Sequence, residues 1–405
     1  MQLYKKSLNF LTLSFIILYP ILPSYGLINS DAILYLLFVV QLAGFIIIKD
    51  ERKLVFKNLK TLKKDKIFTS LIALNILMYL STIIATFKRA AFTGSIRFSM
   101  YIFIYYTISY KFRNKNIGNL LISAFLGVAI FSSLISIYQF LNFEVMDVAV
   151  NSDNRISSFL ENSNNLGVYS ILSIFILIML LLNSKKRNEK IVLSISIILL
   201  IVNIVLSQSR NALIALLFGF ILVAIIYNKR FLLYSFFLFL ILLITPQSRD
   251  RLFSIFDASQ NSSRIKIWEL TKIMIKHKPF TGLGYGNFTL RYKDYINSNP
   301  SYLIGESYTP LHPHNVLLKF QSELGILGTI LLIIFTILTL YTLYKNIKNC
   351  NNSITKSILI GIMISFMLFN FMNIIDCYYD TLKVITSMFI LLGFSNMYSK
   401  NRYLN

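Results

Sequence analysis

Charged residues are scarce in this chain, and their scarcity excludes a soluble globular protein. Only 14% of the 405 residues are charged, whereas 56% are hydrophobic and the mean hydropathy is +0.64. Apolar runs long enough to cross about 30 Å of hydrocarbon recur along the whole length. These runs are continuous rather than alternating, which excludes a β-barrel. The sequence therefore predicts an all-α integral membrane protein.

We predict about twelve transmembrane helices in a single polytopic domain that covers residues 1–405, with no internal repeat and no soluble domain. The predicted spans are 8–27, 32–48, 67–87, 95–110, 118–141, 165–184, 191–207, 211–228, 231–246, 323–344, 357–375 and 383–398. Residues 1–26 also resemble a secretory signal peptide, because two lysines precede an apolar run that ends in small residues. Since further spans follow at once, we expect this first span to be retained.

The distribution of lysine and arginine predicts that both termini are cytoplasmic. With that orientation, 24 of the 40 basic residues lie in inner segments and six in short outer segments, while ten lie in one long outer loop and its flank. An excess of basic residues on the inner side is the usual bias of membrane proteins. The net charge of +23 therefore mainly reflects topology. Its dispersal among the spans gives no support for a nucleic-acid partner, and we expect membrane lipids as the surroundings.

Cysteine and histidine are also scarce, at two and three residues. Cys350 is expected in an inner loop and Cys377 near the outer face, so the two cannot form a disulfide. These few residues give no cluster with the spacing of metal ligands, and we expect neither a metal site nor a cofactor.

Polar sequence is concentrated in the outer loop 247–315, between the ninth and tenth spans, and we expect this loop to carry most of the active site. It ends in the motif HPHN, which contains His312 and His314. Imidazole titrates near neutral pH and is the commonest general base, so His314 is the candidate catalytic residue. His312 and Asn315 are candidate supporting residues, because Pro313 fixes the backbone between the histidines and asparagine caps helices well. A purely structural histidine is the alternative.

Three arginines on the predicted outer face are candidates for binding an anionic substrate. Arg210 lies in SQSRNAL, where one span turns into the next and basic residues are rare. Arg264 begins an amphipathic stretch that we expect to lie on the membrane, with Trp268 at headgroup level. Arg155 lies in the next-largest outer loop. The alternative for each is an arginine that contacts only headgroups or solvent.

Two other features of the loop carry weaker signals. The glycines of GLGYGNF resemble a phosphate-binding loop only superficially, because no strand precedes them and no helix is expected after them. We expect a tight backbone turn instead. His277 lies between two lysines and is interpreted as part of a solvated run of charge.

Arginines beside a histidine, without a metal site, suit a substrate with a charged leaving group such as a diphosphate. Guanidinium binds phosphate oxygens through paired hydrogen bonds and keeps its charge. A neutral histidine is able to remove the proton from an attacking hydroxyl. Because these residues face outward, the substrate must be anchored in the membrane or extracytoplasmic, which disfavours nucleotide-sugar donors and ATP.

Four segments together resemble the O-antigen ligase and polymerase superfamily of bacterial surface-polysaccharide assembly. They read DNRISSFLENSNNLGVY, SQSRNALIALLFG, RIKIW followed by KPFTGLGYGNF, and HPHNVLLKFQSELGILG. The resemblance covers roughly residues 150–330, and twelve spans with one large loop before the tenth agree with it over the full length. It implies a GT-C-like fold in the bacterial inner membrane, with the long loop and the active site periplasmic.

The resemblance also implies metal-independent, inverting transfer of a glycan from undecaprenyl diphosphate to an acceptor hydroxyl. By position, Arg210 and Arg264 would hold the diphosphate and His314 would act on the acceptor, with His312 more variable. The length and the single dominant loop favour a ligase of lipopolysaccharide biosynthesis, whose acceptor is lipid A-core. A repeat-unit polymerase, whose acceptor is a growing glycan, stays open as the alternative.

A polysaccharide or ion transporter is the rival from a different functional class. Transporters carry polar residues or helix breaks in the middle of their spans. The few such residues here are Asn203, Asn370 and Asn373, and the span interiors carry no clear charge. The sequence therefore favours an enzyme over a transporter.

Overall fold

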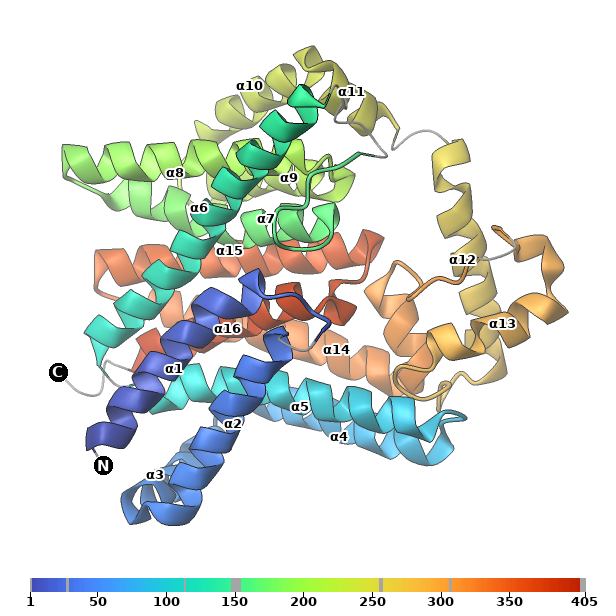
Figure 1. Cartoon of the computed structure of the whole chain (residues 1–405), viewed down its shortest axis with the longest axis horizontal. Helices are drawn as coiled ribbons and strands as arrows, with labels where there is room; N and C mark the ends of the chain where they lie inside the picture. The colour runs from blue at the N-terminus through green and yellow to red at the C-terminus, as the bar shows by residue number, and fades with distance from the viewer. Residues whose placement is uncertain are drawn as a thin grey trace.

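The chain folds into a bundle of α-helices with a smaller group of helices at one end (Figure 1). The computed structural model describes residues 2–26, 29–112, 114–146, 154–254, 258–305 and 308–400, without the side chains of residues 115, 247, 258–261 and 400. Within these ranges the chain is helical and contains no strand. The helices are α1 (Gln2–Ile21), α2 (Ser30–Ile47), α3 (Lys49–Leu62), α4 (Lys66–Ile84), α5 (Lys88–Lys111), α6 (Lys115–Val145), α7 (Ser163–Asn183), α8 (Arg187–Leu206), α9 (Arg210–Ile226), α10 (Phe231–Ile244), α11 (Pro246–Phe253), α12 (Ala258–His277), α13 (Phe288–Ser298), η1 (Pro300–Tyr302), α14 (Val316–Lys348), α15 (Ser353–Ile375), η2 (Tyr378–Asp380) and α16 (Leu382–Lys400).

Every predicted span overlaps a helix of the structure, although 8–27 runs beyond the end of α1 at Ile21. Among the described residues, eight helices are long and apolar enough to cross a membrane, namely α2, α4, α6, α7, α8, α14, α15 and α16. The helices α9 and α10 are apolar but shorter, at 17 and 14 residues. The eight long helices confirm an integral membrane protein by length and composition, whereas the count of twelve spans stays a prediction.

Loops predicted to share one side of the membrane lie together in the structure. At one end, the carboxylate of Glu161 contacts Ser24 at 2.5 and 2.7 Å and Lys383 at 3.3 Å. At the other end, a buried ion pair of 2.6 Å joins Lys111 to Glu51. The helices α12 and α13 lie at the first end, and α1 begins at the other (Figure 1). These contacts join loops that were predicted to share a side, whereas the full topology and the identity of the cytoplasmic end stay predictions.

The centre of the bundle is α7, which is apolar on all sides, as fits a helix enclosed by others. Its residues 166–179 are all buried. Gly219 of α9 and Gly361 of α15 face it closely, because a Cβ on either would overlap the Phe175 ring or the backbone of Ile176. This packing holds the first turn of α7, the start of α9 and the end of α15 beside one another.

The asparagines in the span interiors are bonded within the bundle. Asn203 of α8 bonds serines of α6 and α7 at 2.5 to 3.0 Å. Asn370 of α15 accepts the hydroxyl of Thr336 of α14 at 3.4 Å, and Asn373 accepts the backbone N–H of Tyr378 in η2 at 2.8 Å. Their polar side chains therefore join helices rather than line a path, which weakens the transporter alternative.

The GLGYGNF segment forms the tight turn that the sequence predicts, and its glycines have positive φ. The N–H of Gly284 donates to the carbonyl of Glu323 at 2.8 Å, and a Cβ on Gly282 would overlap the same backbone. The turn packs where Gly325, with φ +68°, breaks α14 into two segments. The expectation that no helix follows the glycines was wrong, because α13 begins at Phe288.

The amphipathic stretch predicted after Arg264 is helical in α12, but its apolar face does not lie on a membrane. Ile267, Leu270 and Met274 are buried against α13 and the glycine turn, in a small core of their own. The prediction of a membrane-surface helix was therefore wrong, because its apolar side meets protein. The helices α12 and α13 and the glycine turn thus form a small folded unit with its own core. The sequence did not predict this unit.

Candidate active site

His314 lies in a strained turn that neighbouring elements hold. Its φ is +50°, a left-handed conformation that residues other than glycine rarely adopt. Asn315 caps the first turn of α14, as predicted, and its amide also donates to the carbonyl of Ile374 at 2.9 Å. Trp268 donates its indole N–H to the carbonyl of Pro313 at 2.8 Å. The helices α12, α14 and α15 together fix this turn.

Asp376, which ends α15, is the side-chain partner of His314. Nδ1 of His314 and Oδ1 of Asp376 are 2.8 Å apart. Burial alone raises the pKa of Asp376, but the hydrogen bond and charge of His314, with the charges of His312 and Arg264, lower it to about 2. The carboxylate is therefore ionised and accepts the hydrogen bond. Nδ1 then carries the proton, which leaves the lone pair on Nε2.

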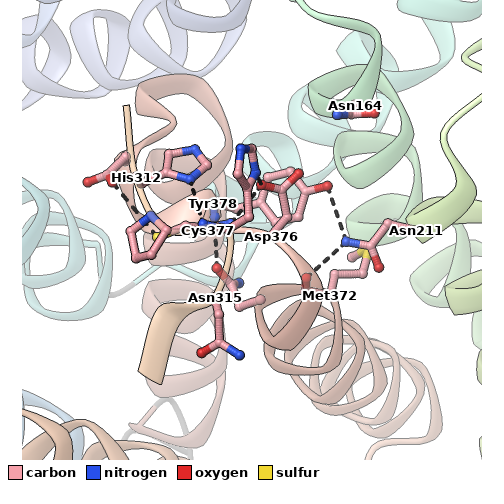
Figure 2. Close-up of polar contacts among 12 residues, drawn as sticks. Asn164, Asn211, His312, Asn315, Met372, Asp376, Cys377 and Tyr378 are labelled. Carbon is pink, nitrogen blue, oxygen red and sulfur yellow. Dashed lines mark hydrogen bonds and ion pairs between the residues drawn. The ribbon is translucent and has the colours of Figure 1, made fainter. Parts of the chain in front are cut away.

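Figure 2 shows the surroundings of this pair, with Asp376 between His312 and Asn211 in the view. Asn211 of α9 donates to the carbonyl of Met372 at 2.9 Å and contacts the Tyr378 hydroxyl at 3.3 Å. These bonds tie the end of α15 to the start of α9. The position of Asp376 is thus set by two helices.

His312 supports the same turn. Its Nδ1 accepts the backbone N–H of His314 at 3.2 Å, and the two rings lie 4.5 Å apart. Burial lowers the pKa of His312, although Asp380 and Asp376 oppose that effect. Burial thus favours the neutral ring, the form in which Nδ1 is able to accept this hydrogen bond.

The two histidines and Asp376 also form a group whose potential metal-ligating atoms lie within 4.8 Å of one another. The sequence predicted no cluster of metal ligands, and this proximity was not visible there because Asp376 lies 62 residues beyond His314 in the chain. However, Nδ1 of each histidine already takes part in a hydrogen bond. These hydrogen bonds orient the imidazoles, which fits a general base better than a metal site.

All three predicted arginines line one cavity of about 330 Å³ beside Asp376. A fourth, Arg251 of α11, joins them. Arg155 donates to Asn164 at 2.6 Å, and Arg210 donates to the carbonyl of Ser254 at 3.0 Å. The other lining residues are Asn164, Ser209, Asn211, Ile214, Ile265, Trp268, Ile375 and Asp376. We call this space the arginine cavity.

The arginine cavity has an excess of positive charge. Burial, together with the charges of Arg251 and Arg210, lowers the pKa of Arg155 to about 10. Arg264 makes no hydrogen bond or ion pair within the described part of the chain. Asp376 is the single carboxylate among the lining residues. Such a cavity suits a ligand with more than one negative charge.

A second cavity of about 270 Å³ adjoins the first and shares Asn164 and Asp376 with it. We call it the histidine cavity, because His312 and His314 line it. The other lining residues are Asn162, Asn165, Tyr308, Thr309, Pro310, Leu311, Cys377, Tyr378 and Thr381. No lysine or arginine is among them. Amide, hydroxyl and phenol groups of this kind suit the hydroxyls of a sugar.

The structure thus brings together every residue that the sequence singled out for the site. It adds Asp376, Arg251 and Asn164, which sequence reasoning missed. The only signals for them were a carboxylate directly after a span and polar residues in outer loops. His277 lies elsewhere, with its ring 5.4 Å from that of Tyr295. The glycine turn lines neither cavity.

Residues 195–333 match the family model Wzy_C, which is described as O-antigen ligase. The matched segment contains three of the four arginines of the arginine cavity and both histidines of HPHN. Arg155 and Asp376 lie outside it. No curated protein matches the chain significantly.

Proposed function

We propose that this chain, a member of the O-antigen ligase superfamily, is a membrane glycosyltransferase that moves a glycan from undecaprenyl diphosphate to an acceptor hydroxyl. The match over residues 195–333 supports a ligase or a related polymerase activity. The proposal rests on two adjoining cavities of different chemistry, which share the lining residues Asn164 and Asp376. A diphosphate beside an oriented base is the arrangement that this transfer requires.

The arginine cavity would hold the diphosphate of the donor. Arg264 has no partner in the described part of the chain, and Arg210 bonds only neutral groups of Ser254. Both guanidiniums therefore keep charge and donors for phosphate oxygens. Ile214, Ile265 and other apolar residues line the same space. They fit the first carbons of a polyprenyl chain that enters from the membrane.

His314 would act as the general base. The acceptor oxygen attacks the anomeric carbon of the glycan while Nε2 of His314 takes the hydroxyl proton. The bond from that carbon to the diphosphate oxygen breaks, and the electron pair leaves with undecaprenyl diphosphate. The arginines stabilise the negative charge that develops on this leaving group. Asp376 stabilises the imidazolium, and a single displacement inverts the anomeric centre.

The histidine cavity would hold the acceptor sugar. Its lining combines neutral hydrogen-bonding groups with the ionised Asp376 and lacks a cationic side chain. An acidic sugar would meet that carboxylate without a counter-ion, so a neutral acceptor is favoured. We propose lipid A-core as the acceptor, in the periplasm, with the protein in the inner membrane and both termini cytoplasmic.

A transfer assay with purified protein tests the catalytic proposal. A strain that lacks the protein supplies the accumulated lipid-linked glycan, and product is followed on gels with and without a chelator. His314→Ala should lower turnover by about 10²–10⁴-fold, whereas His277→Ala, which changes a histidine outside both cavities, should not. Transfer that chelator removes and a divalent metal restores would contradict metal-independent chemistry.

A surface-polysaccharide gel of the same deletion strain separates the acceptors. Loss of a ligase leaves bare core while lipid-linked polymer accumulates. Loss of a polymerase leaves core that carries one repeat unit, and this result would replace the lipid A-core proposal. A strain with neither pattern would favour the transporter.

A further inference from the structure

A third cavity lies at the end of the bundle opposite the active site. Its volume is about 390 Å³, and its walls come from the α3–α4 connection and the last turns of α14 and α16. Three lysines line it, Lys64, Lys66 and Lys345, with neutral donors from threonine, asparagine and serine. The other lining residues are Thr61, Asp65, Tyr341, Thr342, Asn346, Asn349, Asn396 and Ser399.

The single carboxylate in this cavity does not neutralise the lysines. Asp65 accepts hydrogen bonds from the hydroxyls of Tyr105 and Tyr110 at 2.7 to 3.1 Å and from the Asn396 amide at 2.5 Å. It also caps α4 by accepting two backbone N–H groups at 3.1 Å. Both of its oxygens are therefore bonded within the bundle, and its one negative charge offsets at most one of the three lysines.

The lysines have no anionic partner within the described residues. No ion pair involves Lys64, Lys66 or Lys345 there. Lys66 lies 4.3 Å above the Tyr341 ring, a contact that leaves its positive charge in place. The cavity thus offers uncompensated charge beside neutral hydrogen-bond donors, which is the chemistry that binds a phosphate group.

An apolar stripe on α14 leads away from the same cavity. Ile330, Ile334, Ile337, Tyr341 and Tyr344 recur every three or four residues and so share one helix face. Between 40% and 58% of each of these residues is exposed. Tyr341 belongs both to the stripe and to the wall of the cavity. A phosphate in the cavity would therefore have room for attached hydrocarbon along α14.

We propose that this cavity binds the phosphate of an anionic phospholipid, whose acyl chains lie along the exposed stripe of α14. The basic end of the bundle is the predicted cytoplasmic side, where anionic lipid attracts clustered lysines. Bound lipid would link α3 and α4 to α14 and α16, which are far apart in the sequence. This inference does not depend on the reaction at the other end.

Thermal melting of the purified protein in detergent tests the proposal. Phosphatidylglycerol should raise the melting temperature by about 3 °C or more, because a ligand that binds only the folded state stabilises it. Phosphatidylcholine with the same acyl chains and inorganic phosphate serve as separate arms, and both should give clearly smaller shifts. An equal shift with phosphatidylcholine would overturn the charge recognition, and an equal shift with inorganic phosphate would overturn the lipid as ligand.

Two matched variants locate the site. Lys64→Gln with Lys345→Gln should remove most of the shift caused by phosphatidylglycerol. Lys348→Gln with Lys356→Gln removes the same charge from exposed positions outside the cavity and should retain the shift. If the first double variant does not fold, Lys64→Glu alone replaces it. A full shift in the cavity variant would place any lipid elsewhere and overturn the proposal.

Discussion

Replacing Asp376 by asparagine should remove most glycan transfer while nearly preserving the shape of the site. In the wild type the ionised carboxylate accepts a hydrogen bond from Nδ1 of His314 over 2.8 Å, which leaves Nε2 as the base. An amide presents an N–H group as readily as an oxygen, so the imidazole is able to bind in its other tautomer. In that tautomer Nε2 carries the proton and cannot take one from the acceptor hydroxyl.

The size of the loss follows from the role of the base. A positioned general base contributes about 10²–10⁴-fold, and fixing the wrong histidine tautomer in a Ser-His-Asp triad costs about 10⁴-fold. We expect Asp376→Asn to slow transfer by about 10²–10⁴-fold, which corresponds to about 3–5 kcal/mol.

The same substitution should also lower stability. The pKa of Asp376 falls from the ordinary 3.8 to about 2 on folding, which corresponds to about 2 kcal/mol of stabilisation at a pH above the unfolded pKa where the histidines carry charge. Because the folded pKa is the lower one, this contribution is complete above the unfolded pKa and is lost as pH falls through about 2. Transfer must therefore be assayed well below the melting temperature of the variant.

Asp294→Asn is the matched control, because it makes the same change at a carboxylate that is 60% exposed on α13. It should keep the wild-type rate. Binding of lipid-linked donor to Asp376→Asn should persist, since all four arginines remain. Turnover of Asp376→Asn within about threefold of wild type would refute the dyad, because such a change is far below the worth of a general base.

Three further predictions concern the remaining site residues and the bundle. Arg210→Lys and Arg264→Lys should each lose nearly as much transfer as the alanine variants, because an ammonium group cannot form paired hydrogen bonds with a phosphate. Full activity of the lysine variants at matched protein abundance would mean that both arginines only contact lipid headgroups. His314→Ala should slow turnover far more than His312→Ala in the same assay, and the reverse order would move the base by two residues. Asn203→Ala should lower the free energy of unfolding by about 1 kcal/mol and leave turnover normal. Lost transfer at unchanged stability would contradict a structural role.

The helices could be predicted because each is a continuous apolar run, and such runs need no knowledge of tertiary contacts. The helix α10 shows where that reasoning stops. Its predicted span was 231–246, but the helix has 14 residues and ends before Pro246, fewer than the roughly 20 that cross a bilayer. Likewise, the apolar periodicity of α12 predicts a buried helix face but does not tell whether protein or membrane covers it.

Residue type and position on the predicted outer face were enough to select three of the four arginines and both histidines. They could not identify Arg251 or the partner of His314. Asp376 and Asp380 both follow the same span. The packing of α15 against α14 places Asp376 beside His314 and Asp380 beside Lys319. Arg249 and Arg251 stand in the same polar segment. The first pairs with Asp250 in a half-exposed contact, whereas Arg251 lines the arginine cavity.

Lys319 is a second partner that only the fold reveals. Its ammonium is 3.0 Å from Glu323 and 2.9 Å from Asp380, and its side chain is 3% exposed. Glu323 in turn accepts the backbone N–H of Phe288 at 3.1 Å. This buried ion group joins the first segment of α14 to the start of α13. It also holds the loop that carries Asp376.

Lys319→Met should therefore lower the free energy of unfolding by about 3 kcal/mol, because the buried Glu323 and the partly exposed Asp380 lose their cation. The measurement is melting of the purified protein, with Lys293→Met as the control at an exposed lysine of α13. Adding Asp380→Asn to Lys319→Met should recover part of the loss, since one of the unpaired charges disappears. Transfer should fall with Lys319→Met and recover in parallel, because the loop positions Asp376. An unchanged melting temperature for Lys319→Met would mean that Glu323 and Asp380 are protonated in the fold and that no ion group exists.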